Sequence, residues 1–297
     1  MLDTTKYINA YLEAQDKNLR PATITCKLKI IRHFLDYCQE HNIENVSQVQ
    51  KMDVYEFVKS RKWSSQTRSS AEFILRNFFN VMKEKKLSCF DGYELYPIIF
   101  TNKRDKILSY YSPEEIKKII DCMDLSFKCG VRDKCMITIA AETGLRASDI
   151  VHLKFNEIKW DKSLIQKVQI KTQIPVEVPI SDNVKYLLID YMKNHRPQNN
   201  SEFIFINFVT NEPFKNATSL TSIVRKAFIK AGVDISNKKA GAHSLRHSLA
   251  TNMLKNNTAL PIITGVLGHT TVTTTEKYIS VDIEGLRNVS LEVPEYD

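Results

Sequence analysis

The chain has 297 residues, 43% of them hydrophobic, so it can form two domains with substantial cores and is not intrinsically disordered. Its 42 Lys and Arg outnumber 34 Asp and Glu, and the net charge of +8 suits a polyanionic partner such as nucleic acid. The six cysteines form no Cys-x-x-Cys pair, so no metal module is expected. No secretory signal and no apolar stretch of about 20 residues is present, and we expect a cytoplasmic protein with no membrane partner.

Residues 1–86 form the first predicted unit, because they are almost free of Gly and Pro and their apolar residues recur at helical spacing. The pattern predicts a small helical bundle, with helices near 7–12, 23–39, 66–85 and one from residue 52. The basic residues that this pattern leaves exposed are candidates for DNA contacts: Lys27, Lys59, Arg61, Lys62, Arg68 and Arg76. An ordinary solvated surface explains the same residues equally well.

The helical pattern stops between residues 87 and 108, where an Asp-Gly turn signal and Pro97 interrupt it. We interpret this stretch as an interdomain linker. A second unit is predicted over 109–290. Ser112 is a suitable N-cap for its first helix, because Pro follows at the first helical position and Glu115 completes a capping box.

The second unit is predicted to be mainly helical with a small antiparallel sheet. Residues 155–180 give the strand signal, because β-branched residues alternate along much of this run. Helical periodicity is present on both sides of it, at 116–123, 132–142, 145–153, 182–193, 219–231, 244–255 and 261–267. No Gly-rich nucleotide motif is present, so no nucleotide cofactor is expected. The predicted fold is therefore a helical bundle followed by an α+β domain.

Tyr278 is a candidate nucleophile, because a tyrosine hydroxyl can attack phosphorus and hold it as an ester. A packed helix tyrosine is the ordinary alternative for any of the 12 tyrosines. Phosphoryl transfer also needs positive donors, and the planar guanidinium of Arg146 or Arg246 can grip two oxygens. His243 lies one helical turn before Arg246 and is predicted to share its face. For either arginine alone, a surface salt bridge is the commoner role.

Two further residues could take part in such chemistry. His269 follows Gly268 at the end of a short apolar helix, where glycine permits a turn that aims the imidazole into a cleft. Lys171 lies at the predicted sheet turn and could protonate a leaving oxygen. Lys162 and Lys167 compete with it on the same element. The ordinary alternatives are a helix-capping histidine and an exposed hairpin lysine.

Four short motifs resemble those of the tyrosine recombinases, the phage integrase family, and they occur in the family's order. The family's first arginine motif resembles T-G-L-R-A-S-D-I at 143–150, and its hairpin lysine segment resembles I-K-T-Q-I-P-V-E-V-P-I at 170–180. Its H-x-x-R box resembles H-S-L-R-H at 243–247. Its closing histidine and nucleophile resemble L-G-H at 267–269 with Tyr278 nine positions later. Each motif is short, but the ordered set is specific.

The resemblance implies a compact, two-domain enzyme of the Xer or mobile-element kind. Residues 1–86 are similar in size and pattern to the family's SAM-like core-binding domain, and 109–290 would be the catalytic domain. The implied partners are double-stranded DNA with specific recombination sites, further copies of the chain in a homotetramer, and accessory proteins. No metal or cofactor is implied. The tail at 281–297 resembles one that docks on a neighbouring subunit, with internal packing as the alternative.

The resemblance also implies a role for each residue of the site. Tyr278 would attack the scissile phosphate, form a 3′-phosphotyrosyl link and release a 5′-hydroxyl. Arg146, Arg246 and His243 would hold the non-bridging oxygens, with His243 also moving the proton of the nucleophile. His269 would add a further phosphate contact.

The remaining implied roles belong to Lys171, as the acid for the 5′ oxygen, and to Asp149, which would support Arg146 by a charge-assisted bond. Several outcomes stay open at this point. The enzyme would integrate or excise a mobile element, or resolve DNA. A type IB topoisomerase would use the same chemistry without a partner site, and a DNA-binding regulator would keep the fold without the reaction.

Overall fold

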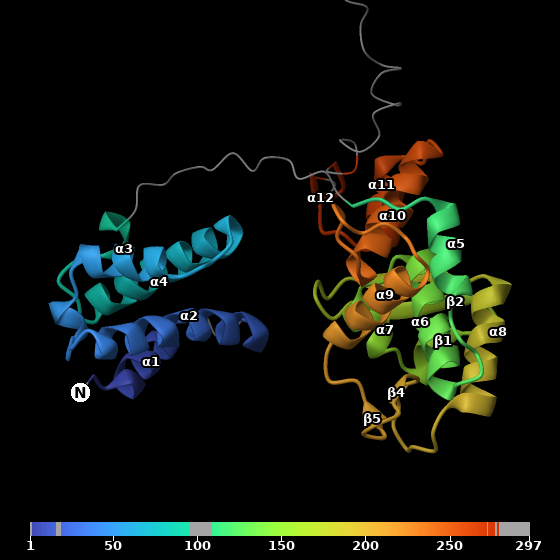
Figure 1. The fold of residues 1–297 in the computed structure, drawn as a ribbon, viewed down its shortest axis with the longest axis horizontal. Helices are drawn as coiled ribbons and strands as arrows, with labels where there is room; N and C mark the ends of the chain where they lie inside the picture. Colours follow the sequence, from blue (N-terminus) through green and yellow to red (C-terminus); the bar gives the residue numbers. More distant parts are fainter. Residues whose placement is uncertain (1, 16–18, 96–108, 272, 277, 279–297) are drawn as a thin grey trace, which may run out of the picture. The chain divides into compact units, whose positions relative to one another are not determined.

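The computed structural model describes residues 2–15, 19–95, 109–271, 273–276 and 278, and the chain divides into two compact units, 1–104 and 105–297 (Figure 1). The predicted linker lies outside the described residues from position 96 onward, and so does the predicted tail at 281–297. Within the described ranges, no helix is both long enough and apolar enough to cross a membrane.

The first unit is helical, as the apolar spacing predicts. Its described part consists of α1 (Thr4–Glu13), α2 (Pro21–Glu40), α3 (Lys51–Ser60) and α4 (Ser65–Glu84), with short 3-10 turns η1 (Val46–Gln48) and η2 (Gly92–Glu94). Phe34 lies in the core, in edge-to-face contact with Phe57 and Phe79 at centroid distances of 5.3 and 5.6 Å. This aromatic cluster gives the unit a buried core of its own.

The second unit is mainly helical with small antiparallel sheets, which confirms the predicted fold class. Its helices are α5 (Pro113–Asp121), α6 (Lys128–Thr143), α7 (Ala147–Val151), α8 (Asp182–Asp190), the π-helical turn η4 (Tyr191–His195), α9 (Thr218–Lys230), α10 (Ala242–Lys255), α11 (Leu260–Leu267) and α12 (Thr273–Glu276), with a 3-10 turn η3 (Phe155–Glu157). The main sheet has the order β1 (Ile158–Lys159), β2 (Leu164–Val168) and β3 (Pro175–Pro179), with antiparallel neighbours.

A second antiparallel pair, β4 (Ile206–Asn207) with β5 (Glu212–Pro213), is not predicted by the sequence pattern. Each of these strands has two residues, which is too short for an alternating pattern to be recognised. In Figure 1 this pair lies at one end of the second unit, whereas α10, α11 and α12 lie together at the opposite end.

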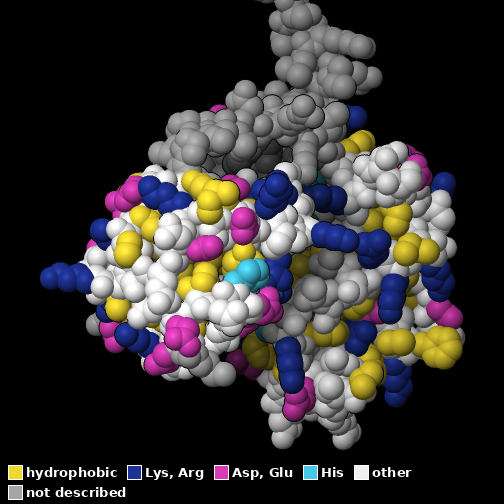
Figure 2. Space-filling model, turned by 60° about the vertical axis from the view of Figure 1, so that its left-hand side comes forward, with side chains coloured by type: hydrophobic (Ala, Val, Ile, Leu, Met, Phe, Trp, Pro, Cys, Tyr) yellow, Lys and Arg dark blue, Asp and Glu magenta, His cyan; other side chains and the backbone are white. Residues whose placement is uncertain are grey.

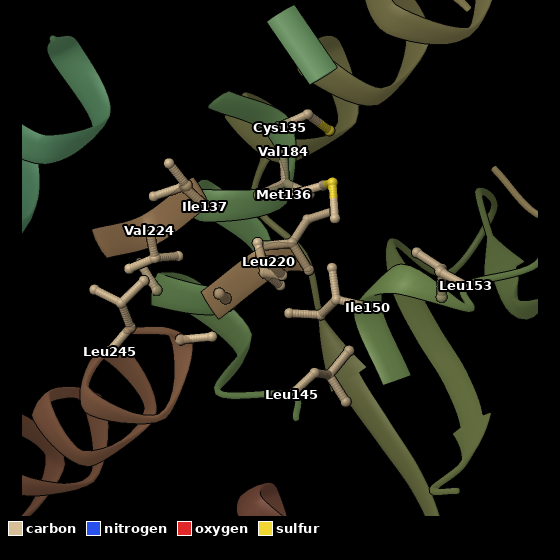
Figure 3. Close-up of a cluster of buried hydrophobic side chains, with 14 of the residues drawn as sticks. Cys135, Met136, Ile137, Leu145, Ile150, Leu153, Val184, Leu220, Val224 and Leu245 are labelled. Carbon is tan, nitrogen blue, oxygen red and sulfur yellow. The ribbon is translucent and has the colours of Figure 1, made fainter. Parts of the chain in front are cut away.

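Helix α6 is the centre of the second unit and packs against α5, α8, α9 and α10. Its Met136 and Ile137 are fully buried and belong to the same cluster as Leu220 and Val224 of α9 and Leu245 of α10 (Figure 3). Enclosure on several sides explains why the stretch from Cys135 to Ala141 is apolar apart from Thr138. Helices α6 and α10, which border the candidate site, therefore share one buried core.

Two glycines end helices beside the candidate site. Gly144 ends α6 with φ 64°, and Gly268 ends α11 with φ 59°, a left-handed conformation that favours glycine. Because the chain turns at Gly144, the helix predicted over 145–153 is shorter and starts only at α7. Arg146 is left with extended backbone at the N-cap of α7.

Candidate active site

Arg246 is held in place by two backbone carbonyls. The residue is only 2% exposed, and its guanidinium donates hydrogen bonds to the carbonyl oxygens of Gly144 and Leu267, each at 2.6 Å. Burial, reinforced by the charge of Arg146, lowers its pKa to about 10, so the group remains charged at neutral pH. Arg246 therefore joins the turn after α6 to the last turn of α11.

Arg146 reaches the same place from the N-cap of α7. Its half-buried guanidinium donates to the side-chain oxygen of Gln169 and, at 3.5 Å, to the carbonyl oxygen of Gly268. Burial lowers its pKa, while the charge of Asp149 raises it. Arg146 and Arg246, the arginine pair, therefore converge on the last turn of α11, where an anion would meet two guanidinium groups.

Asp149 does not make the predicted bond to Arg146 among the hydrogen bonds of the described residues. Its Oδ1 instead accepts a hydrogen bond from the backbone N–H of Ile170 at 2.8 Å, and its buried Oδ2 has no hydrogen-bond partner there. Burial raises the pKa of this carboxyl, whereas the Ile170 N–H and the charges of Lys167 and the arginine pair lower it. Asp149 therefore acts on Arg146 through charge, and its hydrogen bond anchors the hairpin turn that carries Lys171.

Of the three lysines considered on this hairpin, Lys171 and Lys162 are exposed. Lys167 is only 4% exposed, and its Nζ lies 2.7 and 2.9 Å from the carboxylate oxygens of Glu157 and 3.0 Å from the carbonyl oxygen of His152. This ion pair makes Lys167 unsuitable as a mobile acid, because moving it would leave a buried charge unpaired. Lys171 directly follows the residue that Asp149 anchors.

Gln169 connects the hairpin to the arginine pair, and the sequence analysis missed it. Its fully buried amide donates from Nε2 to the carbonyl oxygen of Leu267 at 3.1 Å, and its Oε1 accepts from Arg146 and from Thr172 Oγ1, the latter at 2.9 Å. Gly268 makes room for it, since a Cβ there would lie 2.6 Å from Oε1. No local signal marks Gln169, because Leu267 lies 98 residues away in the chain.

Tyr278 is fully buried in a small apolar cluster with residues of α10 and α11. Its ring is nearly parallel to that of His269, with an interplanar angle of 9° and centroids 6.4 Å apart. The Nδ1 atom of His269 lies 2.9 Å from Thr275 Oγ1. Burial raises the pKa of Tyr278 to about 12, although the charges of Arg246 and Arg146 act against this shift. The hydroxyl is therefore protonated at neutral pH and lies in the field of the arginine pair.

One histidine of α10 contacts this tyrosine, and a second lies beside that histidine. His247 is only 7% exposed, and its Nδ1 is 2.9 Å from the Tyr278 hydroxyl. His243, one turn earlier, is exposed, and its ring centroid lies 4.2 Å from that of His247. His243 was the residue predicted to move the proton of the nucleophile, and His247 was not among the predicted site residues. The signal was present, because residues four apart on a helix share a face.

His243 also lines a cavity of about 410 Å³ at the N-terminal end of α10. Arg225, Lys238 and Lys239 contribute basic side chains to the same lining. The cavity therefore adds positive charge beside the histidines.

The basic candidates of the first unit differ in their surroundings. Three of them are exposed, namely Lys59, Lys62 and Arg68. Lys27 donates to the side chain of Gln15 at 2.8 Å, and the Arg61 guanidinium covers the ring of Phe57 at 5.0 Å. Arg76 is half-buried. On the face drawn in Figure 2, Lys and Arg side chains are spread among acidic and hydrophobic ones.

The site gathers two guanidinium groups, imidazole rings and a buried phenol around the last turn of α11. Such a set can bind a phosphate ester and stabilise the charge that develops on its oxygens. Within the described ranges, no group of His, Cys, Asp or Glu side chains is placed to hold a metal ion.

Comparisons with known proteins agree with this chemistry. The model of the phage integrase family matches residues 110–284. Tyrosine recombinase XerD of Staphylococcus aureus is 26% identical over 282 residues, which cover 92% of each chain. A Sinorhizobium fredii protein named as an integrase/recombinase, y4rA, is 28% identical over 298 residues, which cover 97% of this chain and 71% of the relative.

Two solved structures share the fold at low sequence identity. One is the XerH site-specific recombinase bound to a palindromic difH substrate, with 18% identity and a TM-score of 0.75 over 96% of this chain and 83% of that chain. The other is a lambda integrase dimer bound to a COC′ core site, with 14% identity and a TM-score of 0.69 over 99% of each chain. Since the family model covers more than half of its residues, the chain belongs to the phage integrase family, the tyrosine recombinases.

Proposed function

We propose that this chain is a site-specific recombinase that cleaves and rejoins double-stranded DNA through a 3′-phosphotyrosyl intermediate on Tyr278. The observation that carries the proposal is the convergence of Arg146 and Arg246 on the last turn of α11, with Tyr278 in their field. A phosphodiester presents two non-bridging oxygens, and guanidinium groups bind such oxygens in a fixed geometry.

The proposed reaction gives each of these groups a role. The Tyr278 hydroxyl gives its proton to a histidine of α10 and its oxygen attacks phosphorus, so that a phosphorus–tyrosine oxygen bond forms while the bond to the 5′ oxygen breaks. The arginine pair and His243 bind the non-bridging oxygens, and His269 adds a further contact. Lys171, exposed on the hairpin turn, gives a proton to the departing 5′ oxygen. The 5′-hydroxyl of a partner strand then attacks the ester and restores the tyrosine.

The proposal extends to the organisation of the chain. Residues 1–86 would bind DNA as a core-binding domain and 109–290 would supply the chemistry, with 87–108 between them. We propose four copies acting in the cytoplasm on two DNA sites, with accessory proteins and with the tail at 281–297 docked on a neighbour. The DNA complexes of XerH and lambda integrase support duplex DNA as the partner. The role would be integration or excision of a mobile element, or resolution of DNA.

A covalent-adduct assay tests the nucleophile. The chain is incubated with a supercoiled plasmid carrying the DNA that flanks its gene, and denaturing electrophoresis then detects protein bound to DNA. Wild type should form the adduct, and Tyr278→Phe should bind DNA without forming it. Tyr186→Phe is the control, since Tyr186 is 72% exposed, and it should behave as wild type.

Other outcomes of this assay point elsewhere. An adduct formed by Tyr278→Phe would refute the assignment of the nucleophile. Relaxation of a plasmid without exchange between paired sites would indicate a topoisomerase. DNA binding by wild type without any adduct would indicate a regulator.

A further inference from the structure

We propose that His247 positions the nucleophile: its Nδ1 accepts the hydrogen bond of the Tyr278 hydroxyl and holds that oxygen ready beside the arginine pair. The inference rests on the proposed function, because it concerns the same site. The H-x-x-R spacing does not include His247, and the predicted roles assigned the proton of the nucleophile to His243 instead.

The contact between these two side chains is short and enclosed. His247 Nδ1 lies 2.9 Å from the Tyr278 hydroxyl, and the ring centroids are 5.4 Å apart at an interplanar angle of 60°. His247 is 7% exposed and Tyr278 is 0% exposed. A hydrogen bond between two buried groups is costly to lose, because water does not replace the missing partner.

The protonated phenol has a hydrogen to donate in this contact. A buried Tyr278, whose pKa is raised to about 12, keeps its single hydroxyl proton at neutral pH. A neutral imidazole offers one nitrogen as an acceptor, and Nδ1 is the nitrogen within reach. In the proposed arrangement the hydroxyl donates to His247, and the lone pairs of its oxygen stay available to attack phosphorus.

Helix α10 carries both His247 and one residue of the arginine pair. Arg246, the residue before His247, is fixed by the carbonyl oxygens of Gly144 and Leu267. One rigid helix therefore sets both a phosphate donor and the oxygen of the nucleophile, and reactions of this kind depend steeply on such alignment.

The other side of the tyrosine is held from α11 and α12. The backbone N–H of Tyr278 donates to the carbonyl oxygen of Thr275 at 3.0 Å. The Thr275 hydroxyl in turn lies 2.8 Å from Thr264 Oγ1 of α11. The backbone is thus held from one side while His247 holds the hydroxyl from the other.

Three substitutions at one position test the proposal with the full chain. His247→Leu removes the acceptor and keeps an apolar side chain of similar bulk. His247→Asn places an amide oxygen near the position of Nδ1, and His247→Gln places it near Nε2. The rate of adduct formation on the supercoiled plasmid should fall about 10- to 100-fold in the Leu variant. The Asn variant should recover most of that loss and exceed the Gln variant, and plasmid affinity should be unchanged in all three.

Two results would overturn the proposal: a Leu variant that reacts as fast as wild type or faster, or an Asn variant no faster than the Gln variant. A second measurement does not depend on catalysis. The Nδ1 resonance of ¹⁵N-labelled His247 should shift between wild type and Tyr278→Phe, and an unchanged resonance would also overturn the proposal. If wild type forms no adduct, the proposed function fails, and the resonance alone then decides whether His247 holds the hydroxyl.

Discussion

Replacing Gln169 with Leu should destabilise the second unit markedly, because it removes three hydrogen bonds at once. The bonds with Leu267 and Thr172 are uncharged and contribute about 1 kcal/mol each. The bond from Arg146 is charged and lies at the lower end of about 1.5–3 kcal/mol, because this guanidinium is half-buried and water can partly replace the amide. Leu is similar in length, so the cavity term is small. The free energy of unfolding should fall by roughly 3 to 3.5 kcal/mol.

Urea denaturation followed by circular dichroism measures this loss. With an m-value of about 2 kcal/mol/M, the midpoint for the second unit should fall by about 1.5 M. Gln166→Leu is the matched control, since Gln166 is exposed on β2, three residues earlier in the chain, and its side chain donates to Glu177, at 2.8 Å. It should cost less than about 0.5 kcal/mol. A difference below about 1 kcal/mol between the two variants would refute the view that Gln169 holds the site together.

Three more predictions concern the same region. Gly268→Ala should cost about 2 kcal/mol or more, because φ is 59° and the new Cβ would overlap the buried glutamine amide. The control is Gly265→Ala, whose Cβ would meet nothing within 4 Å and which should not destabilise the protein. Thermal unfolding measures both variants, and an equal loss of stability in the two would contradict the argument. Lys171→Ala should lose at least about 100-fold in cleavage of ordinary DNA and recover on DNA with sulfur at the 5′ bridging position, which leaves without a proton. Lys162→Ala should cleave both substrates, and a Lys171 variant that stays inactive on the sulfur substrate would rule out its acid role. Tyr278 has a pKa of about 12 when folded against 10 when unfolded, so the unfolded chain loses its proton first as the pH rises. Wild type should therefore lose about 2 kcal/mol of stability relative to Tyr278→Phe between pH 10 and 12. Urea denaturation of both proteins across this range measures the loss. If the difference between their two midpoints stays constant, the phenol is not buried.

The fold was largely predictable because its signals are local. The alternation within 155–180 produces β2 and β3, and the apolar spacing places α8 to α11 close to their predicted ranges. A glycine that ends a helix adopts a left-handed conformation from local sterics alone, which placed Arg146 after Gly144 and His269 after Gly268. The two-residue strands β4 and β5 carry no period and escaped prediction.

The contacts of the site were less predictable, because they depend on which distant segments meet. The amide of Gln169 reaches α11, the carboxylate of Asp149 reaches the hairpin, and His247 reaches Tyr278. Each of these contacts joins two elements, and the residue pattern within one element does not show which other element it will contact. For His247 a local signal was available, because helical spacing puts it on the same face as His243, but its pairing with Tyr278 was not predicted.

The arginine pair has a further property with consequences for affinity. In the described part of the chain, its hydrogen bonds all go to uncharged oxygens: the carbonyls of Gly144, Leu267 and Gly268 and the amide of Gln169. Helix ends such as those of α6 and α11 carry only a fraction of a charge, so the guanidinium groups are oriented without being neutralised. If a carboxylate replaced these carbonyl and amide oxygens, each arriving anion would first have to displace it from the guanidinium groups. The arginine pair instead keeps a preset positive potential, which a phosphate can meet without first breaking an ion pair.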